Sequence, residues 1–312
     1  LYRPANEGLV IVGNFRNKLV FSEFDLHAAA NSDGFIIFLD DNLSVENILH
    51  LTSSRQVTLT DAQTNEDGDI YLYGTFKGNV SIDEFSVRSN GGSDLILIKI
   101  SSSGKVQDLK VFGGSDDEYS SSLALGPDQV FLSGSFLNQA TFGSISLKSK
   151  GHEDGFTLSL SSSDLSQLKW CQSFGGTGVD RIEGLSVSTS QKLLASGTFH
   201  GLIEIHDKQY DSGDGSGVFA VILDSSGDLL STSAFLASGY ASNYISEWNP
   251  VDESFLLAGN FGGTMVIDQN QVSSNGGKDI FVAKFSEDLT AENLLSLGGV
   301  WNDRVLDMNI DA

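Results

Sequence analysis

The chain contains few of the residues that cross-link a protein, restrict its backbone or supply positive charge. Its 312 residues include 1 cysteine, 3 prolines and 18 lysines and arginines, against 41 aspartates and glutamates. The lone Cys171 excludes an internal disulfide, and we expect a small packed side chain there. The net charge of −23 disfavours binding to nucleic acid or to anionic membranes, because both partners are negatively charged.

Long apolar segments and helical patterns are missing as well. No apolar run approaches the roughly 20 residues that a membrane-spanning helix needs, so we expect no membrane insertion. Apolar residues do not recur at a spacing of about 3.6 anywhere for long, whereas short alternating segments are common. The chain is therefore predicted to be all-β.

One motif recurs through the whole chain: an apolar run that ends in Gly-x-Phe. The motif phenylalanines are separated by 61, 60, 63 and 62 residues, a period typical of repeat architectures. The phenylalanines are Phe15, Phe76, Phe136, Phe199 and Phe261, and the glycines are Gly13, Gly74, Gly134, Gly197 and Gly259.

Two further patterns keep the same period. An aspartate precedes an apolar strand in four of the units, at Asp33, Asp94, Asp154 and Asp279. A Phe-Gly-Gly turn begins at Phe112 and Phe174, and Leu297 begins a similar turn. Unit four has lost both features, and unit one has lost the turn.

Five units of about 61 residues account for nearly all of residues 1–312, which we interpret as a single domain. Each unit predicts four or five short strands in one antiparallel sheet, and radial packing buries both faces of such sheets. This predicts a five-bladed β-propeller, with an open solenoid as the alternative. We expect the C-terminal strand, residues 304–312, to pair with residues 8–15 and close the ring, because closure removes exposed edges.

The segments 274–285 and 174–180 resemble the SBBP-type β-propeller repeat, which joins Gly-x-Phe, a Gly-Gly-x-Asp-x-Phe-Val-x-Lys strand and a Phe-Gly-Gly-x-x-x-Asp turn. The resemblance covers the chain five times, although units one and four are degenerate. It implies a propeller and an extracellular or cell-surface location. It transfers no catalytic residue.

The repeated aspartates are interpreted as structural, because a side chain needed in nearly every unit fits loop anchoring better than catalysis. Two acidic loops are weak candidates for a calcium site, although neither has the spacing of an EF-hand. Their residues are Asp116, Asp117, Asp211 and Asp214. The five histidines are scattered and form no recognised metal or catalytic pattern. We therefore expect no cofactor, with Ca²⁺ as the exception.

Three aromatic residues occupy related connections of different units: Tyr119, Tyr240 and Trp301. Exposed aromatics on one rim can stack on sugars or anchor a partner, and the alternative is packing between blades.

Three functions follow for testing. The first is a non-enzymatic interaction or assembly module that binds a protein partner or itself. The alternatives are a carbohydrate-binding propeller that uses the rim aromatics, and a glycosidase with a carboxylate pair in the central channel. The absence of a catalytic pattern favours the non-enzymatic function. For self-association we predict strand addition at blade edges, at residues 80–87 and 266–272.

Overall fold

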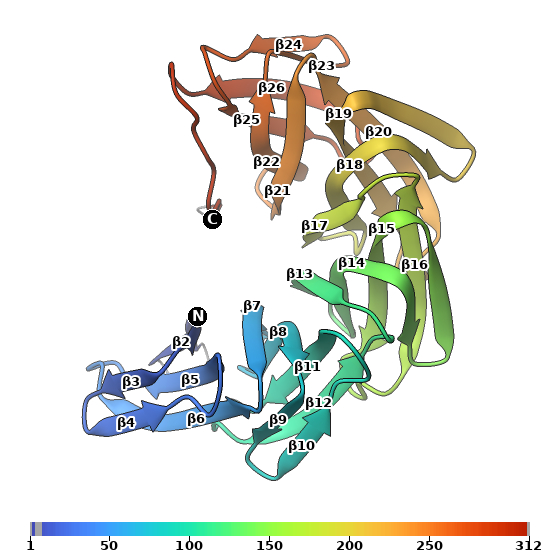
Figure 1. Ribbon diagram of the computed structural model, residues 1–312. Helices are drawn as coiled ribbons and strands as arrows, with labels where there is room; N and C mark the ends of the chain where they lie inside the picture. The colour runs from blue at the N-terminus through green and yellow to red at the C-terminus, as the bar shows by residue number, and fades with distance from the viewer. Residues whose placement is uncertain (1, 4–7, 311–312) are drawn as a thin grey trace.

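The computed structural model describes residues 2–3 and 8–310, which form antiparallel strands and connecting turns arranged in an open arc (Figure 1). The all-β prediction is confirmed. No helix long and apolar enough to cross a membrane occurs in these residues. The strands group into five units in chain order. In each unit, the Gly-x-Phe strand pairs with the apolar strand that begins at or contains the position of the repeated aspartate.

The first two units contain the N-terminal third of the chain. Unit one consists of β2 (Gly8–Phe15), β5 (Asp33–Leu39) and β6 (Val45–Ser53), with the short β1 (Tyr2–Arg3) and the hairpin of β3 (Lys18–Phe21) and β4 (Phe24–His27). Unit two consists of β7 (Gln56–Thr64), β8 (Ile70–Lys77), β11 (Asp94–Ile100) and β12 (Val106–Phe112), with the hairpin of β9 (Asn79–Ile82) and β10 (Phe85–Arg88).

The remaining units follow the same plan. Unit three consists of β13 (Glu118–Leu125), β14 (Gln129–Phe142), β15 (Ile145–Ser161) and β16 (Leu168–Gly176). Unit four consists of β17 (Arg181–Val187), β18 (Leu193–Ile205), β19 (Lys208–Leu223) and β20 (Leu229–Ala237). Unit five consists of β21 (Tyr240–Asn249), β22 (Ser254–Gly262), β25 (Asp279–Phe285) and β26 (Ala291–Leu297), with the hairpin of β23 (Thr264–Ile267) and β24 (Asn270–Ser273).

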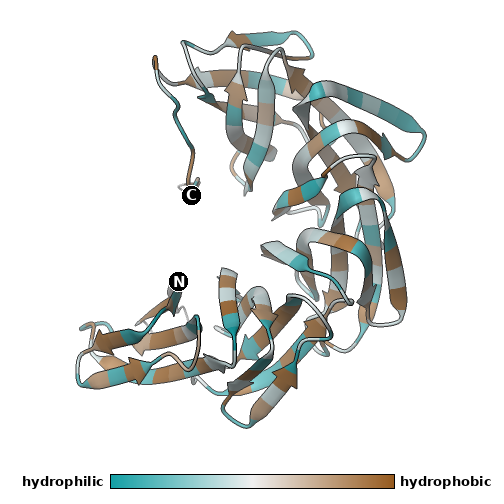
Figure 2. Cartoon of the chain, viewed as in Figure 1, coloured by the Kyte–Doolittle hydropathy of each residue, from teal (hydrophilic) through white to brown (hydrophobic). Residues whose placement is uncertain are grey.

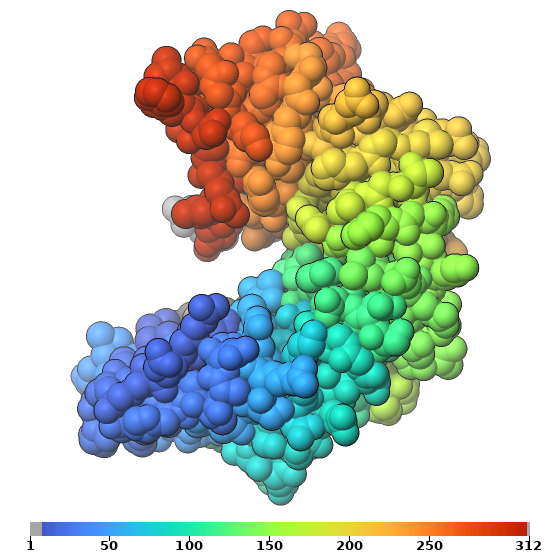
Figure 3. Space-filling view, in the orientation of Figure 1, coloured from blue at the N-terminus to red at the C-terminus, as the bar shows by residue number. Residues whose placement is uncertain are grey.

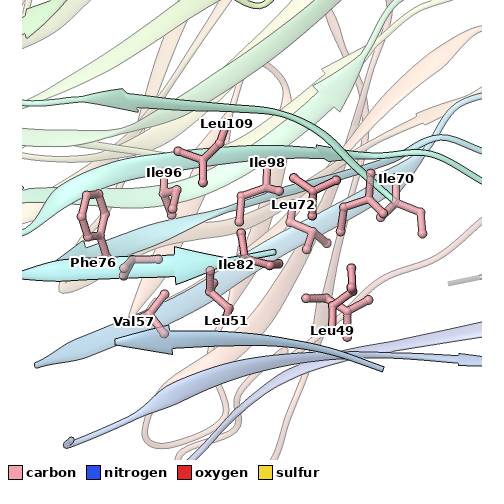
Figure 4. Packing of buried hydrophobic residues seen from close by; sticks show 14 of the residues in the cluster. Leu49, Leu51, Val57, Ile70, Leu72, Phe76, Ile82, Ile96, Ile98 and Leu109 are labelled. Carbon is pink, nitrogen blue, oxygen red and sulfur yellow. The ribbon is translucent and has the colours of Figure 1, made fainter. Parts of the chain in front are cut away.

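Four apolar clusters fill the junctions between neighbouring units. The cluster between units one and two brings together Leu51, Leu72, Phe76 and Ile96, each at most 1% exposed (Figure 4). Clusters of the same kind join units two and three, three and four, and four and five. Burial of one such side chain stabilises the fold by roughly 1.5–3 kcal/mol. The uninterrupted apolar runs of central strands such as β8 and β11 thus give a sheet between two neighbours an apolar face toward each of them.

The long strands of unit three correct one detail of the predicted organisation. The sequence predicts a break at 137–139 and a loop at 150–153, but β14 and β15 continue through both. The pairing shifts register between Leu137 and Gln139, and Asn138 has φ of 52°. Asparagine tolerates this left-handed conformation, so the chain forms a bulge instead of ending the strand.

The predicted ring closure is wrong for this structure. Residues 302–310 belong to no strand, and the described partners of β2 are β1 and β5. Asp311 and Ala312, at the end of the predicted closing strand, lie outside the described residues. The two ends of the arc instead face each other across an opening, which the space-filling view shows as a deep hollow (Figure 3). The sheets therefore form a row of units without a closed ring.

Candidate functional site

The hollow side of the arc is lined by one strand from each of units two to five: β7, β13, β17 and β21 (Figure 1). We call these the inner strands. Each pairs with the Gly-x-Phe strand of its own unit, and each pairing shifts register at the corresponding place. The bulge bends every inner strand in the same way, so equivalent residues of different units point into equivalent surroundings.

Four carboxyl groups on the inner strands have raised pKa values, those of Asp61, Glu118, Glu183 and Glu247. Burial raises the pKa of Glu183 to about 7, although the Thr198 hydroxyl donates a hydrogen bond to it at 2.6 Å. Burial also raises the pKa of Glu247 to about 7, and the negative charges of Asp307 and Asp61 add to the effect. Burial raises the pKa of Asp61 as well, against the hydrogen bond that Leu123 N–H donates at 2.8 Å. Acidic groups thus gather along the hollow.

An ion pair between the exposed Arg181 and the buried Glu153 fixes the start of β17. The Arg181 guanidinium donates through Nε to Glu153 Oε1 at 2.7 Å and through Nη2 to Glu153 Oε2 at 2.9 Å. The Ser135 hydroxyl donates a further bond to Glu153 Oε1, and Glu153 is only 3% exposed. Because both carboxylate oxygens are satisfied, we assign this group a structural role in holding neighbouring units together.

A cavity of about 590 Å³ lies where the inner strands end, at one rim of the hollow. Its walls come from the turns after β7, β13 and β17 and from the end of β21. The lining residues that carry polar or aromatic groups are Gln63, Thr64, Asn65, Ser188, Thr189, Gln191 and Trp248, with Glu66 and Asp67 at the edge. Amides and hydroxyls beside one aromatic ring are suited to a neutral polar ligand.

Trp248 is held in place within this cavity. Its indole Nε1–H donates to the Thr189 hydroxyl at 3.0 Å, and its ring meets Phe255 edge-on with centroids 4.8 Å apart. The sequence prediction missed Trp248. An aromatic near the end of an inner strand was the available signal, but its meaning depends on which strand ends share a rim.

The aromatic residues predicted from the sequence as a binding site do not line this cavity. Tyr119 and Tyr240 begin inner strands whose other ends line the cavity, so they lie away from it. Tyr240 packs under Lys278, whose Nζ is 3.7 Å from the ring centroid, and Trp301 is 81% exposed in the segment after β26. No contact joins Tyr119, Tyr240 and Trp301 in the part of the chain that the structure describes.

The acidic residues nominated for calcium accept hydrogen bonds within their own loop or from a neighbouring loop. Asp117 Oδ1 accepts the Ser93 N–H at 2.7 Å, and Asp211 Oδ1 accepts the Gly213 N–H at 2.8 Å. Asp116 accepts from the Ser115 hydroxyl at 3.3 Å, and Asp214 is exposed. Within residues 2–3 and 8–310, no group of three or more histidines, cysteines and acids is arranged to hold a metal ion.

The repeated aspartates are buried and anchor their own loops. One oxygen of each accepts a backbone N–H from four residues earlier, at 2.9–3.0 Å. The donors are Ala29 for Asp33, Asn90 for Asp94, Lys150 for Asp154 and Asn275 for Asp279. This is the side-chain-to-backbone bonding that their recurrence predicts.

A second acid lies against this aspartate in unit two. Glu118 accepts the Gly114 N–H at 3.1 Å, and its other oxygen and Asp94 Oδ1 are buried with no hydrogen-bond partner. Burial raises the pKa of Glu118 to about 8 and that of Asp94 to about 6, and the charge of Asp94 raises the former further. The pair is therefore able to hold a proton near neutral pH.

Cys171 is not a candidate nucleophile. It is half-buried against the cluster between units two and three, whereas its neighbour Trp170 packs into the next cluster. Burial raises the pKa of its thiol well above the ordinary value, so the reactive thiolate is disfavoured.

No profile of a known protein family matches the chain, and no curated protein matches it.

Proposed function

We propose that the chain is a non-enzymatic interaction and assembly module, built on a five-bladed propeller plan and working outside the cell or at its surface. The uncovered apolar surface at the end of the array carries the proposal. Leu295 and Leu297 are 51% and 50% exposed, Val300 is 72% exposed and Trp301 is 81% exposed. Apolar side chains clustered in this way are typical of surfaces that a partner covers.

The propeller plan is supported by the radial order of the units around the hollow (Figure 1) and by the resemblance of the repeat to SBBP-type sequences. That resemblance is also what supports the extracellular location. The strongly acidic surface keeps such a module soluble and directs it away from phosphate-rich partners.

Partner binding is tested with the paired variants Val300→Asp and Val251→Asp. Both valines are highly exposed, at 72% and 75%, but only Val300 belongs to the end surface. We expect Val300→Asp to weaken self-association or capture of a purified partner at least tenfold in sedimentation velocity or biolayer measurements, and Val251→Asp to change neither. A protein that stays monomeric, captures nothing and turns over a small substrate would overturn the proposal.

A second function, carbohydrate binding, is favoured by the rim cavity. Trp248 offers a fixed aromatic face beside amide and hydroxyl groups, which is the combination that holds a sugar ring. We expect a glycan array to show binding that Trp248→Ala removes and Trp301→Ala leaves intact. Loss with Trp301→Ala alone would move the site to the aromatics predicted from the sequence, and binding to no glycan would eliminate this function.

A glycosidase needs two carboxyl groups about 5–10 Å apart, one of them protonated near neutral pH. Glu247 and Asp61 are the candidates, because burial and the charge of Asp307 raise the pKa of both carboxyl groups, and the charge of Asp61 raises the pKa of Glu247 further. Assay of Glu247→Gln against chromogenic glycosides tests this alternative. Unchanged or absent hydrolysis would argue against it.

A further inference from the structure

The first unit lacks an element that every other unit has. The Gly-x-Phe strands β8, β14, β18 and β22 are each covered on one edge by an inner strand. In the described part of the chain, the corresponding edge of β2 carries only β1, opposite Gly8 and Leu9. From Ile11 to Phe15 this edge has no strand partner, so its backbone groups are open to a further strand.

The surroundings of Gly13 differ from those of the other motif glycines in the way that a missing inner strand explains. At Gly74, Gly134, Gly197 and Gly259 an added Cβ would collide with a backbone carbonyl oxygen of the inner strand. At Gly13 it would meet only the Phe35 ring, at 2.8 Å. Gly13 is also partly exposed, whereas its four counterparts are buried. The glycine thus leaves space for a carbonyl that the isolated chain does not supply.

The hairpin of unit one is unpartnered in the same sense. In units two to five, the residue five positions after the motif phenylalanine meets the outer strand of the preceding unit, in the pairs Thr52–Ser81, Gly113–Thr141, Gly175–Glu204 and Leu236–Val266. Counting five from Phe15 gives Val20, which is 61% exposed. At the other end of the array, Leu297 is equivalent to Phe112 and Phe174. Gly298 is therefore equivalent to Gly113 and Gly175, the residues that pair with the hairpin of the next unit.

These pairings also revise the predicted docking edges. β9 lies between β6 and β10, and β23 lies between β20 and β24, so residues 80–81 and 266 are already paired on both sides. β10 and β24 end their sheets, so the outer part of each predicted segment keeps an open edge, as do the two ends of the arc.

The strands of the two sheets that border the opening are rich in apolar residues (Figure 2), and some of these residues are left uncovered. On unit one these are Leu9, Ile11 and Phe35, whose counterparts in unit two, Ile70, Leu72 and Ile96, are fully buried at a junction. On unit five they are Leu256, Ile280, Val282, Leu295 and Leu297, all half-buried or exposed. At each of the four internal junctions, the face equivalent to that of unit five packs against the face equivalent to that of unit one.

The segment 303–310 carries the sequence of an inner strand. Asp303 accepts the Gly299 N–H at 2.9 Å, as Asp180 accepts the Gly176 N–H at 2.7 Å ahead of β17. Aligned on these aspartates, Val305 matches Ile182, which is fully buried, and Met308 matches Leu185, which is 5% exposed. The segment therefore has an inner strand's anchor and apolar positions but lacks a sheet to join.

We propose that a second copy of this chain docks head to tail and supplies this sheet. Residues 303–310 of one copy add to β2 of the next as its inner strand, and residues 298–299 meet the next copy's β3 at Val20. The register of β17 on β18 transfers as Arg304 opposite Asn14, Asp307 opposite Val12 and Met308 opposite Ile11. The proposal rests on the assembly function above and specifies its geometry.

A second copy is favoured because the four apolar clusters fix the curvature of the arc and keep its own ends apart (Figure 3). A head-to-tail contact uses different surfaces on each partner, so it extends into larger rings or filaments. The net charge of −23 on each copy opposes the contact. Association should therefore strengthen as salt rises from about 50 mM to about 500 mM, because screening reduces the repulsion and leaves apolar burial in place.

Disulfide trapping tests the register. In a Cys171→Ser background, Ile11→Cys and Met308→Cys are made as separate proteins and mixed under mild oxidation. We expect covalent dimers in the mixture and few in either protein alone. The double variant should give a ladder of oligomers on a non-reducing gel. Val12→Cys replaces Ile11→Cys in the matched control and should cross-link several-fold less, because a shift of one residue turns the side chain to the other face of the sheet.

Two surface variants give an independent measure. Met308→Lys and Val20→Lys lie outside the four clusters, so the monomer should fold normally by circular dichroism. Each should reduce self-association at least tenfold. A disulfide within a single chain of the double variant would show that the ends join in the same molecule, and an unlinked monomer at high salt would show that they do not join; either result overturns the proposal. If Met308→Lys still captures a purified partner as wild type does, the interaction function stands and only this geometry fails.

Discussion

β18 and β2 carry the same Gly-x-Phe motif at different places in the arc. Inside the array, β18 is covered by β17 on one edge and β19 on the other, and Gly197 is buried against the β17 backbone. At the end of the array, β2 has β5 on one edge and, among the residues that the structure describes, two residues of β1 on the other. The Gly-x-Phe motif therefore makes room for an inner strand on its edge, but whether that strand is present depends on the place of the unit in the arc.

Two junctions between units give a second contrast. The junction of units two and three has the buried acids Asp94 and Glu118, and the corresponding positions at the junction of units four and five are Gly217 and Ala241. Both acids are replaced together by small uncharged residues. A buried carboxyl group requires either a partner or a proton, so removing the pair leaves no unmatched group behind.

The largest expected effect compares one position at an internal junction and at the end. Phe235 is 3% exposed in the cluster between units four and five, and Leu297 holds the same position of unit five but is 50% exposed. We expect Phe235→Ala to lower the free energy of unfolding by about 3–5 kcal/mol, as truncation of a buried phenylalanine does. Leu297→Ala should cost less than about 1 kcal/mol in the monomer. Urea unfolding measures both, and equal losses would contradict the contrast.

The next effect compares two motif glycines. Gly197→Ala places a methyl group against the Arg181 carbonyl oxygen, so the inner strand must shift at a cost of roughly 1–3 kcal/mol or more. Gly13→Ala meets only the Phe35 ring and should cost less, while blocking head-to-tail association. Thermal unfolding and sedimentation velocity separate the two effects. Equal destabilisation by both substitutions would mean that Gly13 already has its inner strand.

The smallest effect concerns pH. Glu118 has a pKa of about 8 in the folded protein against an ordinary value of 4.5. Between these values the folded protein holds a proton that the unfolded chain has released, so its stability should fall as pH rises from about 5 to about 8. Below this range both states are protonated, and above it both are ionised.

The Glu118→Gln variant cannot ionise at this position and should reduce that decline, with a slope remaining from Asp94, whose pKa is about 6, and from Glu183 and Glu247, whose pKa values are about 7. Melting temperatures across the same range check this. The matched control is Asp41→Asn at an exposed acid, which should keep the wild-type slope. A Glu118→Gln curve parallel to wild type would show that Glu118 is already ionised in the folded protein.

Much of the local organisation was predictable from the sequence. Continuous apolar runs mark β8, β11 and β25, and the Gly-x-Phe period places equivalent strands in equivalent units. The anchoring role of the repeated aspartates also followed from recurrence, since a hydrogen bond to a backbone N–H four residues away is a local interaction.

The candidate sites were less predictable because they depend on contacts between units. Trp248 becomes part of a cavity only because Thr189 and the turns of units two and three, which are distant in sequence, surround it. The rim aromatics Tyr119, Tyr240 and Trp301 occupy related positions, yet their surroundings differ because Lys278 covers one ring and solvent surrounds another.

The sequence by itself determined that the chain is all-β, where its strands lie and which residues recur, because hydrophobic alternation and turn chemistry act over a few residues. Only the tertiary structure decided that the ring stays open and that residues 302–310 form no strand. Closure depends on the combined curvature of four packed junctions, and the pattern of a short segment does not determine that curvature. The edge of β2 therefore stays open although its local sequence is that of an internal strand.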